Sequence, residues 1–156
     1  MKQLNQYIIE KFKISSKTVN KKEYSCKPKD RIELREIIQD RLKEDKDADL
    51  NDIDISSIWT LNFLFQDLDP HNIDISQWDT SNVKHMNGVF LNCKNFNCDL
   101  SNWDVSNVQD MFAMFNSCKK FKGEGLENWK VNLKTNTKQM FQYCDNLQNK
   151  PSWYKE

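Results

Sequence analysis

Three cysteines recur at nearly equal spacing, at Cys93, Cys118 and Cys144, and they are the first residues here that could do chemistry. Thiolates are soft metal ligands, and side chains on adjacent strands, about 4.8 Å apart, could share an ion. However, cysteine is also among the most buried residue types, and these three continue an apolar pattern that no histidine joins. We therefore expect core cysteines and no metal or other cofactor.

Two sets of aspartates also recur at a regular spacing. The second set, Asp54, Asp79 and Asp104, precedes Ser-containing turns, where a carboxylate caps nearby backbone N–H groups. The first set comprises Asp49, Asp74 and Asp99, and it has two open interpretations. It could form a solvated acidic face that binds a partner, or it could form a calcium site. Because the chain lacks the glycine-rich loops of calcium-binding repeats, we prefer the solvated face, with Asp74 and Asp99 as candidate binding residues.

Catalysis has little support in this sequence. His71 and His85 occupy non-equivalent positions, and the spacing brings no Ser or Cys beside either. No nucleophile elbow, phosphate-binding loop, zinc-protease motif or kinase signature is present. We therefore expect a protein that is not an enzyme.

These residues are positioned by an internal repeat. The stretch from Asp74 to Phe96 reads DISQWDTSNVKHMNGVFLNCKNF, and the stretch from Asp99 to Phe121 reads DLSNWDVSNVQDMFAMFNSCKKF. Self-similarity at a fixed period indicates stacked repeats. We divide the chain into rungs at about 48–72, 73–97, 98–122 and 123–148, followed by a C-terminal stub that contains Trp153.

Each rung carries two patterns. Alternation over 96–101 predicts a short strand, and the i, i+3, i+4, i+7 spacing of Met86, Val89, Phe90 and Cys93 predicts a short helix. One strand and one short helix in each repeat predict an α/β, leucine-rich-repeat-like solenoid of about four rungs. A tryptophan ladder in the core is expected at Trp78, Trp103 and Trp129, with Ile53 in the first rung.

Residues 1–47 are expected to cap the open end of the first rung. Apolar residues at helical spacing predict a helix over 4–14, and a lysine-rich segment over 18–26 is typical of an edge strand. Asp30 followed by Glu33 forms a capping box that predicts a helix over about 30–44. Together they make an N-terminal helix–strand–helix cap.

The rungs resemble the BspA-like leucine-rich repeats of the mycoplasma-lipoprotein type, over about residues 48–147. The shared form is D-[IL]-S-x-W-D-[TV]-S-N-V-x-x-M-x-x-[MV]-F-x-x-C, which the second and third rungs match throughout. The resemblance implies a leucine-rich-repeat-like solenoid that binds other macromolecules, and it brings no catalytic residues. Members are often secreted or lipid-anchored, whereas this sequence shows no signal peptide, lipobox or apolar run of about 20 residues, so we expect a cytoplasmic protein without membrane contact.

Charge is distributed unevenly, although the chain has 23 basic and 23 acidic residues. Residues 48–121 are net acidic, and both flanking segments are net basic. The N-terminal lysines are interleaved with acids and lack interleaved aromatics, so nucleic acid is not the expected partner. Five cysteines without a CxxC pair fit free thiols in a reducing compartment.

The sharpest functional signal lies where a rung departs from its neighbours. Four positions that are otherwise mostly polar carry large apolar side chains, and we predict binding residues there: Trp59, Leu91, Phe112 and Tyr143. Trp59 has a second interpretation, packing against the N-terminal cap. The expected function is non-catalytic protein–protein recognition, by a cytoplasmic adaptor or by an inhibitor of a host protein encoded by a phage or mobile element. The alternatives are a structural protein that self-associates through an open solenoid end, and a metal-binding protein or enzyme.

Overall fold

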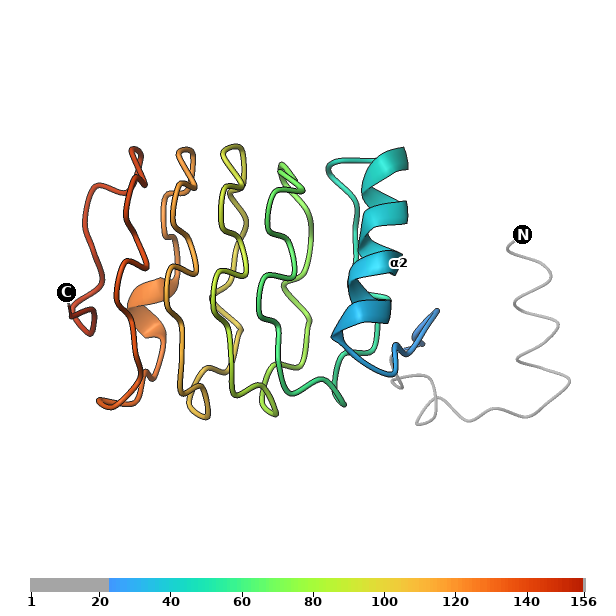
Figure 1. Ribbon diagram of the computed structural model, residues 1–156, viewed down its shortest axis with the longest axis horizontal. Coiled ribbons are helices and arrows are strands. Elements are labelled where there is room, and N and C mark those ends of the chain that lie inside the picture. The colour runs from blue at the N-terminus through green and yellow to red at the C-terminus, as the bar shows by residue number, and fades with distance from the viewer. Residues whose placement is uncertain (1–22, 156) are drawn as a thin grey trace, which may run out of the picture.

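The computed structural model describes residues 23–155, which form a row of side-by-side coils with one helix at its N-terminal end (Figure 1). Helix α2 spans Arg31–Glu44, and the 3-10 helix η1 spans Leu126–Asn128. The predicted helix over 4–14 and most of the predicted strand over 18–26 lie outside the described residues. Cys26, at the end of that segment, forms an isolated parallel bridge with Ile53 of the first rung.

Helix α2 begins where the capping box predicted. The Asp30 carboxylate accepts hydrogen bonds from the N–H groups of Ile32 and Glu33, at 2.8 and 3.0 Å, and the Glu33 carboxylate accepts one from the Lys29 N–H at 2.8 Å. These bonds satisfy N–H groups that have no partner inside the helix. The helix buries Leu34, Ile38 and Leu42 in the common core, and in Figure 1 it runs alongside the first rung.

The short helices that we predicted within the rungs are absent from the described residues, which contain only α2 and η1. Met86, Val89, Phe90 and Cys93 are all fully buried, as the apolar spacing required, but the backbone makes consecutive turns. For example, the Leu91 N–H donates to the Gly88 carbonyl and the Cys93 N–H to the Phe90 carbonyl. Left-handed φ angles at Gly88 (53°) and Asn92 (63°) interrupt any helix, because a right-handed helix needs φ near −63°.

The short strand expected over 96–101 is also absent. Among the described residues, β pairing is confined to isolated parallel bridges, including Asp49 with Asp74 and His85 with Asp110. The rungs are held together instead by single backbone hydrogen bonds between neighbouring rungs. The residues that the strand and helix patterns assigned to the core are nevertheless buried, so the patterns located the core correctly and misassigned the backbone.

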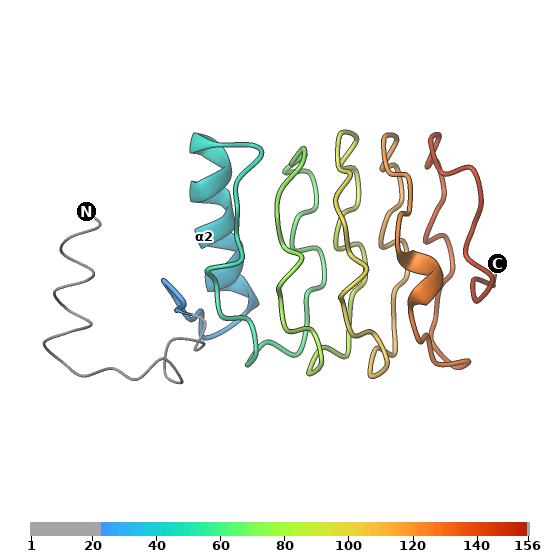
Figure 2. The same ribbon diagram turned by 180° about the vertical axis from the view of Figure 1, so that it is seen from behind.

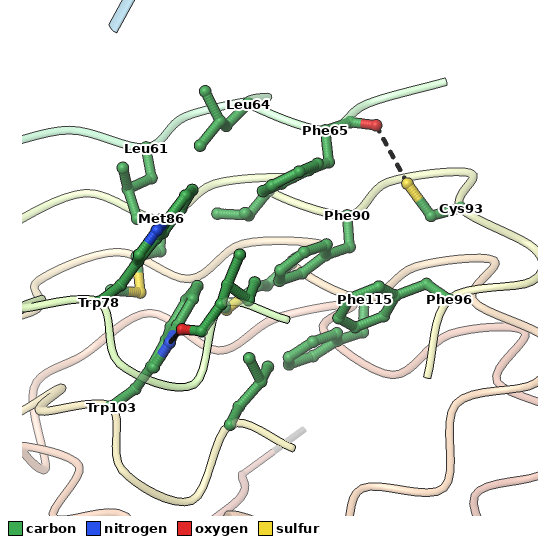
Figure 3. Packing of buried hydrophobic residues seen from close by; sticks show 14 of the residues in the cluster. Leu61, Leu64, Phe65, Trp78, Met86, Phe90, Cys93, Phe96, Trp103 and Phe115 are labelled. Carbon is green, nitrogen blue, oxygen red and sulfur yellow. Dashed lines mark hydrogen bonds between the residues drawn. The ribbon is translucent and has the colours of Figure 1, made fainter. Parts of the chain in front are cut away.

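Aromatic rings run through the core from rung to rung. Phe65, Phe90, Phe115 and Phe141 stack in sequence, with ring centroids 5.2, 5.5 and 5.8 Å apart. A second pair, Phe96 and Phe121, stacks beside them at 5.7 Å. Figure 3 shows Phe65, Phe90 and Phe115 in this arrangement, with Trp78 and Trp103 forming a neighbouring column. Offset stacks of this kind add to the free energy gained from burying the rings.

The fourth rung differs from the others. The sequence separation between the bridged residues Asp110 and Asn136 is longer by one than that between His85 and Asp110, and η1 lies in this rung (Figure 2). Beyond it, Trp153 stacks on Trp129 with ring centroids 6.1 Å apart, and Pro151 is buried. The segment around Trp153 therefore continues the tryptophan column by one step. No helix among residues 23–155 has the length and apolar composition needed to cross a bilayer.

Candidate functional site

The recurring cysteines are part of the core and tie the rungs together. Each thiol donates to the carbonyl of a phenylalanine in the preceding rung at 3.0 Å: Cys93 to Phe65, Cys118 to Phe90 and Cys144 to Phe115. Figure 3 shows the first of these bonds. Burial raises the pKa of Cys93 to about 12, so the thiol is protonated at neutral pH. In residues 23–155 no three or more His, Cys, Asp or Glu side chains gather where they could hold a metal ion.

The tryptophans have the same role on the other side of the coil. The indole N–H of Trp78 donates to the Leu50 carbonyl at 2.9 Å, and that of Trp103 donates to the Ile75 carbonyl at 3.0 Å. Trp129 and Trp153 repeat the bond with the carbonyls of Leu100 and Leu126. Each indole ring therefore packs in the core, and its N–H group finds an acceptor in a carbonyl of the preceding rung.

Both aspartate sets cap turns. In each case the carboxylate accepts the N–H two residues further on, for example Ser76 to Asp74 at 3.0 Å and Ser101 to Asp99 at 2.8 Å. Hydrogen bonds from the backbone and side chain of Ser101 lower the pKa of Asp99. Asp74 and Asp99 are exposed at the surface, so they remain accessible to a partner while serving the turn.

Arg35 of α2 caps the carbonyl edge of the first rung. Its guanidinium donates to the carbonyls of Phe63 and Gln66, at 2.7 and 2.9 Å, and also to that of Leu64. In the next rung, the carbonyls equivalent to Leu64 and Gln66 belong to Val89 and Leu91, and each accepts an N–H from the rung before. Arg35 thus supplies the donors that a preceding rung would supply.

At the opposite edge, the C-terminal segment covers part of the fourth rung, because the Thr137 hydroxyl donates to the Lys155 carbonyl and Tyr154 packs against the ring of Phe141. Among residues 23–155, however, this segment does not bond the alternate backbone N–H groups of the rung. We call residues 61–67, 86–92, 111–117 and 137–143 the turn runs. Ala113, Phe115 and Ser117 of the third turn run donate to carbonyls of the fourth, at 3.0, 3.0 and 2.8 Å. Their equivalents, Gln139, Phe141 and Tyr143, have no acceptor for their N–H groups within residues 23–155. We call these three N–H groups the amide row.

A hollow of about 420 Å³ opens beside the amide row. Its apolar walls include Phe112, Phe141 and Tyr154, and its polar lining includes Lys138 and Lys150. No carboxylate is among the described residues that line it. We call it the end hollow, and it combines apolar surface, positive charge and backbone donors at one end of the row of coils.

The four predicted aromatic and aliphatic binding residues do not form one patch. Phe112 lines the end hollow, and Tyr143 is 64% exposed and belongs to the amide row, but neither Leu91 nor Tyr143 lines the end hollow. Leu91 is half-buried. Trp59 is 59% exposed and lines a separate hollow of about 240 Å³ together with Ile32 of α2, and we call it the second hollow.

Sequence reasoning missed several residues of these surfaces. Arg35 directly follows the buried Leu34 on α2. This neighbouring position was the only feature of the sequence that could have indicated a role for Arg35. Lys138 occupies a position where the other rungs have Asn62, Asn87 and Phe112, so a comparison of charge at that position could have identified it. The amide row had no signal in the sequence, because backbone donors are the same for every residue except proline.

The model of one protein family matches residues 33–154, and its description is "Mycoplasma protein of unknown function, DUF285". The match begins inside α2, earlier than the 48–147 covered by the repeat resemblance, so it includes most of this helix as well as the rungs. No curated protein and no solved structure matches the chain. Because the match covers most of its length, the chain belongs to the DUF285 family of Mycoplasma proteins, which is related to the BspA-like repeat proteins.

Proposed function

We propose that this chain is a non-catalytic protein–protein recognition module built on a leucine-rich-repeat-like solenoid of the BspA-like type. Hydrogen bonds that recur at equivalent positions from one rung to the next support the solenoid assignment. The recurring Cys, Trp and Asp residues serve stacking and turns, which leaves the non-recurring residues to carry recognition. Solenoids commonly present extended binding surfaces of this kind.

The observation that carries the proposal is that departures from the repeat line hollows. Phe112 replaces the Asn or Lys found at its position in the other rungs, and it forms part of the end hollow. Trp59 replaces Lys84 and Gln109, and it forms part of the second hollow. Large aromatic side chains held at a concave surface are typical of binding hot spots.

Self-association by head-to-tail stacking is the weaker alternative. Such stacking would place the amide row of one copy against the carbonyl edge of the first rung of the next. That edge is covered by α2, and Arg35 already donates to the Phe63, Leu64 and Gln66 carbonyls. The capped edge therefore favours a different protein as the partner, and we expect a monomer in sedimentation velocity at high concentration.

Affinity capture with the full chain tests the proposal. One variant combines Phe112→Asp in the end hollow with Tyr143→Ser in the amide row, and the other is Trp59→Ser in the second hollow. The control is Leu133→Ser, because Leu133 is 83% exposed and lines neither hollow. We expect the wild type and the control to retain a protein from a host lysate, and at least one of the hollow variants to lose it. Equal retention by all four chains, or no retained protein from repeated captures, would contradict the proposal.

A further inference from the structure

The backbone-to-backbone hydrogen bonds between turn runs all point the same way. In the second turn run, alternate N–H groups donate to carbonyls of the next rung: Gly88 to Phe112 at 2.8 Å, Phe90 to Met114 at 2.9 Å and Asn92 to Asn116 at 3.0 Å. The third turn run repeats the pattern toward the fourth. The equivalent N–H groups of the fourth turn run therefore face the far edge, where they form the amide row.

The amide row has the geometry of a binding edge. Its donors come from alternate residues, as they do in each complete step of the stack, so three alternate carbonyls of another segment would meet them. Gln139 and Tyr143 have left-handed φ angles of 58° and 59°. Their equivalents in the third turn run, Ala113 and Ser117, have similar φ angles of 52° and 65°, so the fourth run keeps the backbone that directs alternate N–H groups at the next rung.

The end hollow adds charge and apolar contact to these donors. Lys138 and Lys150 contribute positive charge, and no described carboxylate lines the hollow. Phe112 is 37% exposed, so its ring is available to a side chain that enters. An occupant that complements this surface carries backbone carbonyls, acidic side chains and at least one apolar side chain.

We propose that this edge binds an acidic peptide segment of another protein, which stacks on the fourth turn run as one further rung. Three alternate carbonyls of the segment accept from Gln139, Phe141 and Tyr143. An apolar side chain enters the end hollow, and carboxylates lie near Lys138 and Lys150. This mode resembles the addition of a strand to an open sheet edge. It rests on the proposed function of protein recognition and specifies its site and partner chemistry.

A synthetic peptide of residues 104–117 of this chain is a suitable probe. It contains Asp104 and Asp110 and no Lys or Arg. In the folded protein, the carbonyls of its residues Asp110, Phe112, Met114 and Asn116 accept the amides of the second turn run, so its sequence supports the required backbone. The matched control peptide has both aspartates replaced by asparagine.

Binding is followed by NMR on the ¹⁵N-labelled full chain. We expect saturable binding of the acidic peptide, with amide exchange at Gln139, Phe141 and Tyr143 slowed by about tenfold or more. The Asp→Asn peptide should bind more weakly. The variant Lys138→Glu should weaken the acidic peptide about fivefold, whereas Lys134→Glu, an equal charge change outside the end hollow, should not.

In the peptide experiment, two results would overturn the edge proposal: no saturable binding up to about 1 mM peptide, or binding that leaves exchange of the amide row unchanged. Amide spectra of both lysine variants show whether each is folded before affinities are compared. The proposed function fails separately, through capture experiments that return no protein. If a captured host protein is retained equally by Lys138→Glu and by wild type, recognition stands and the edge proposal falls.

Discussion

Arg35 is expected to be the largest single contributor to the junction between α2 and the first rung. We consider Arg35→Met, which keeps an unbranched apolar stem and removes all hydrogen-bond donors. The wild-type guanidinium donates to the carbonyls of Phe63, Leu64 and Gln66. In the variant these carbonyls lose donors at an edge that α2 covers.

The expected loss follows from these three bonds. A hydrogen bond from a charged donor contributes about 1.5–3 kcal/mol when buried. Arg35 is half-buried, and only the bonds to Leu64 and Gln66 are partly buried, so water replaces part of what is lost. We therefore expect the free energy of unfolding to fall by about 2–4 kcal/mol. Burial and the neighbouring Arg31 lower the pKa of Arg35, but an arginine remains charged at neutral pH.

Urea unfolding followed by tryptophan fluorescence measures this loss. With a slope of about 1–3 kcal/mol/M, the midpoint should fall by roughly 1–2 M. Arg31→Met is the matched control, because Arg31 lies one turn earlier on α2 and donates to no first-rung carbonyl within residues 23–155. Midpoints for the two variants that agree within about 0.2 M would refute the capping role of Arg35.

Three further predictions concern the stack. Phe115→Ala should lower the free energy of unfolding by about 3–5 kcal/mol, since the ring is fully buried between stacked rings, and a loss under about 1 kcal/mol in urea unfolding would contradict this. Ile53→Trp matches the repeat consensus, yet it should destabilise the fold by about 1–3 kcal/mol, because no rung before the first offers the indole a carbonyl in the part of the chain that the structure describes. Increased thermal stability would contradict this prediction. Hydrogen bonds from Ser56, with a smaller effect of Lys27, hold the pKa of Asp54 at about 2, below the usual 3.8. The carboxylate therefore stabilises the fold fully above about pH 4 and loses this contribution as pH falls toward 2. In Asp54→Asn, the free energy of unfolding should consequently fall less between about pH 4 and 2 than it does in the wild type.

The core and the N-terminal boundary of α2 could be predicted from the sequence. Periodicity placed Met86, Val89, Phe90 and Cys93 inside, and all four are fully buried. The same periodicity predicted a helix wrongly. A run of turns with left-handed residues four positions apart brings the same side chains inward, and apolar spacing alone does not distinguish the two backbones.

Substitutions in the first rung show what the sequence could not explain. Ile53 and Leu68 replace Trp and Cys at ladder positions, which looked like ordinary apolar exchange. In the structure each ladder residue donates to a carbonyl of the rung before it, and within residues 23–155 no rung precedes the first. Whether Trp or Cys is favoured at a ladder position therefore depends on an acceptor that lies a whole rung away in the sequence, and local sequence patterns do not reveal it.

The candidate site was predicted only in part. Phe112 and Trp59 line hollows as departures from the repeat suggested, but Leu91 lines neither of them. The lysines of the end hollow and the amide row depend on where the rungs meet in space. A repeat alignment shows equivalence between positions, and it does not show which edge is left open.

Amide hydrogen exchange of the free protein tests the open edge most directly. It compares matched positions of the third and fourth turn runs: Ala113 with Gln139, Phe115 with Phe141, and Ser117 with Tyr143. We predict that the third-run amides exchange about a thousandfold more slowly than the fourth-run amides, because only the former have acceptors within the described chain. Equal protection at the two sets of positions would contradict the open edge and, with it, the proposed mode of recognition.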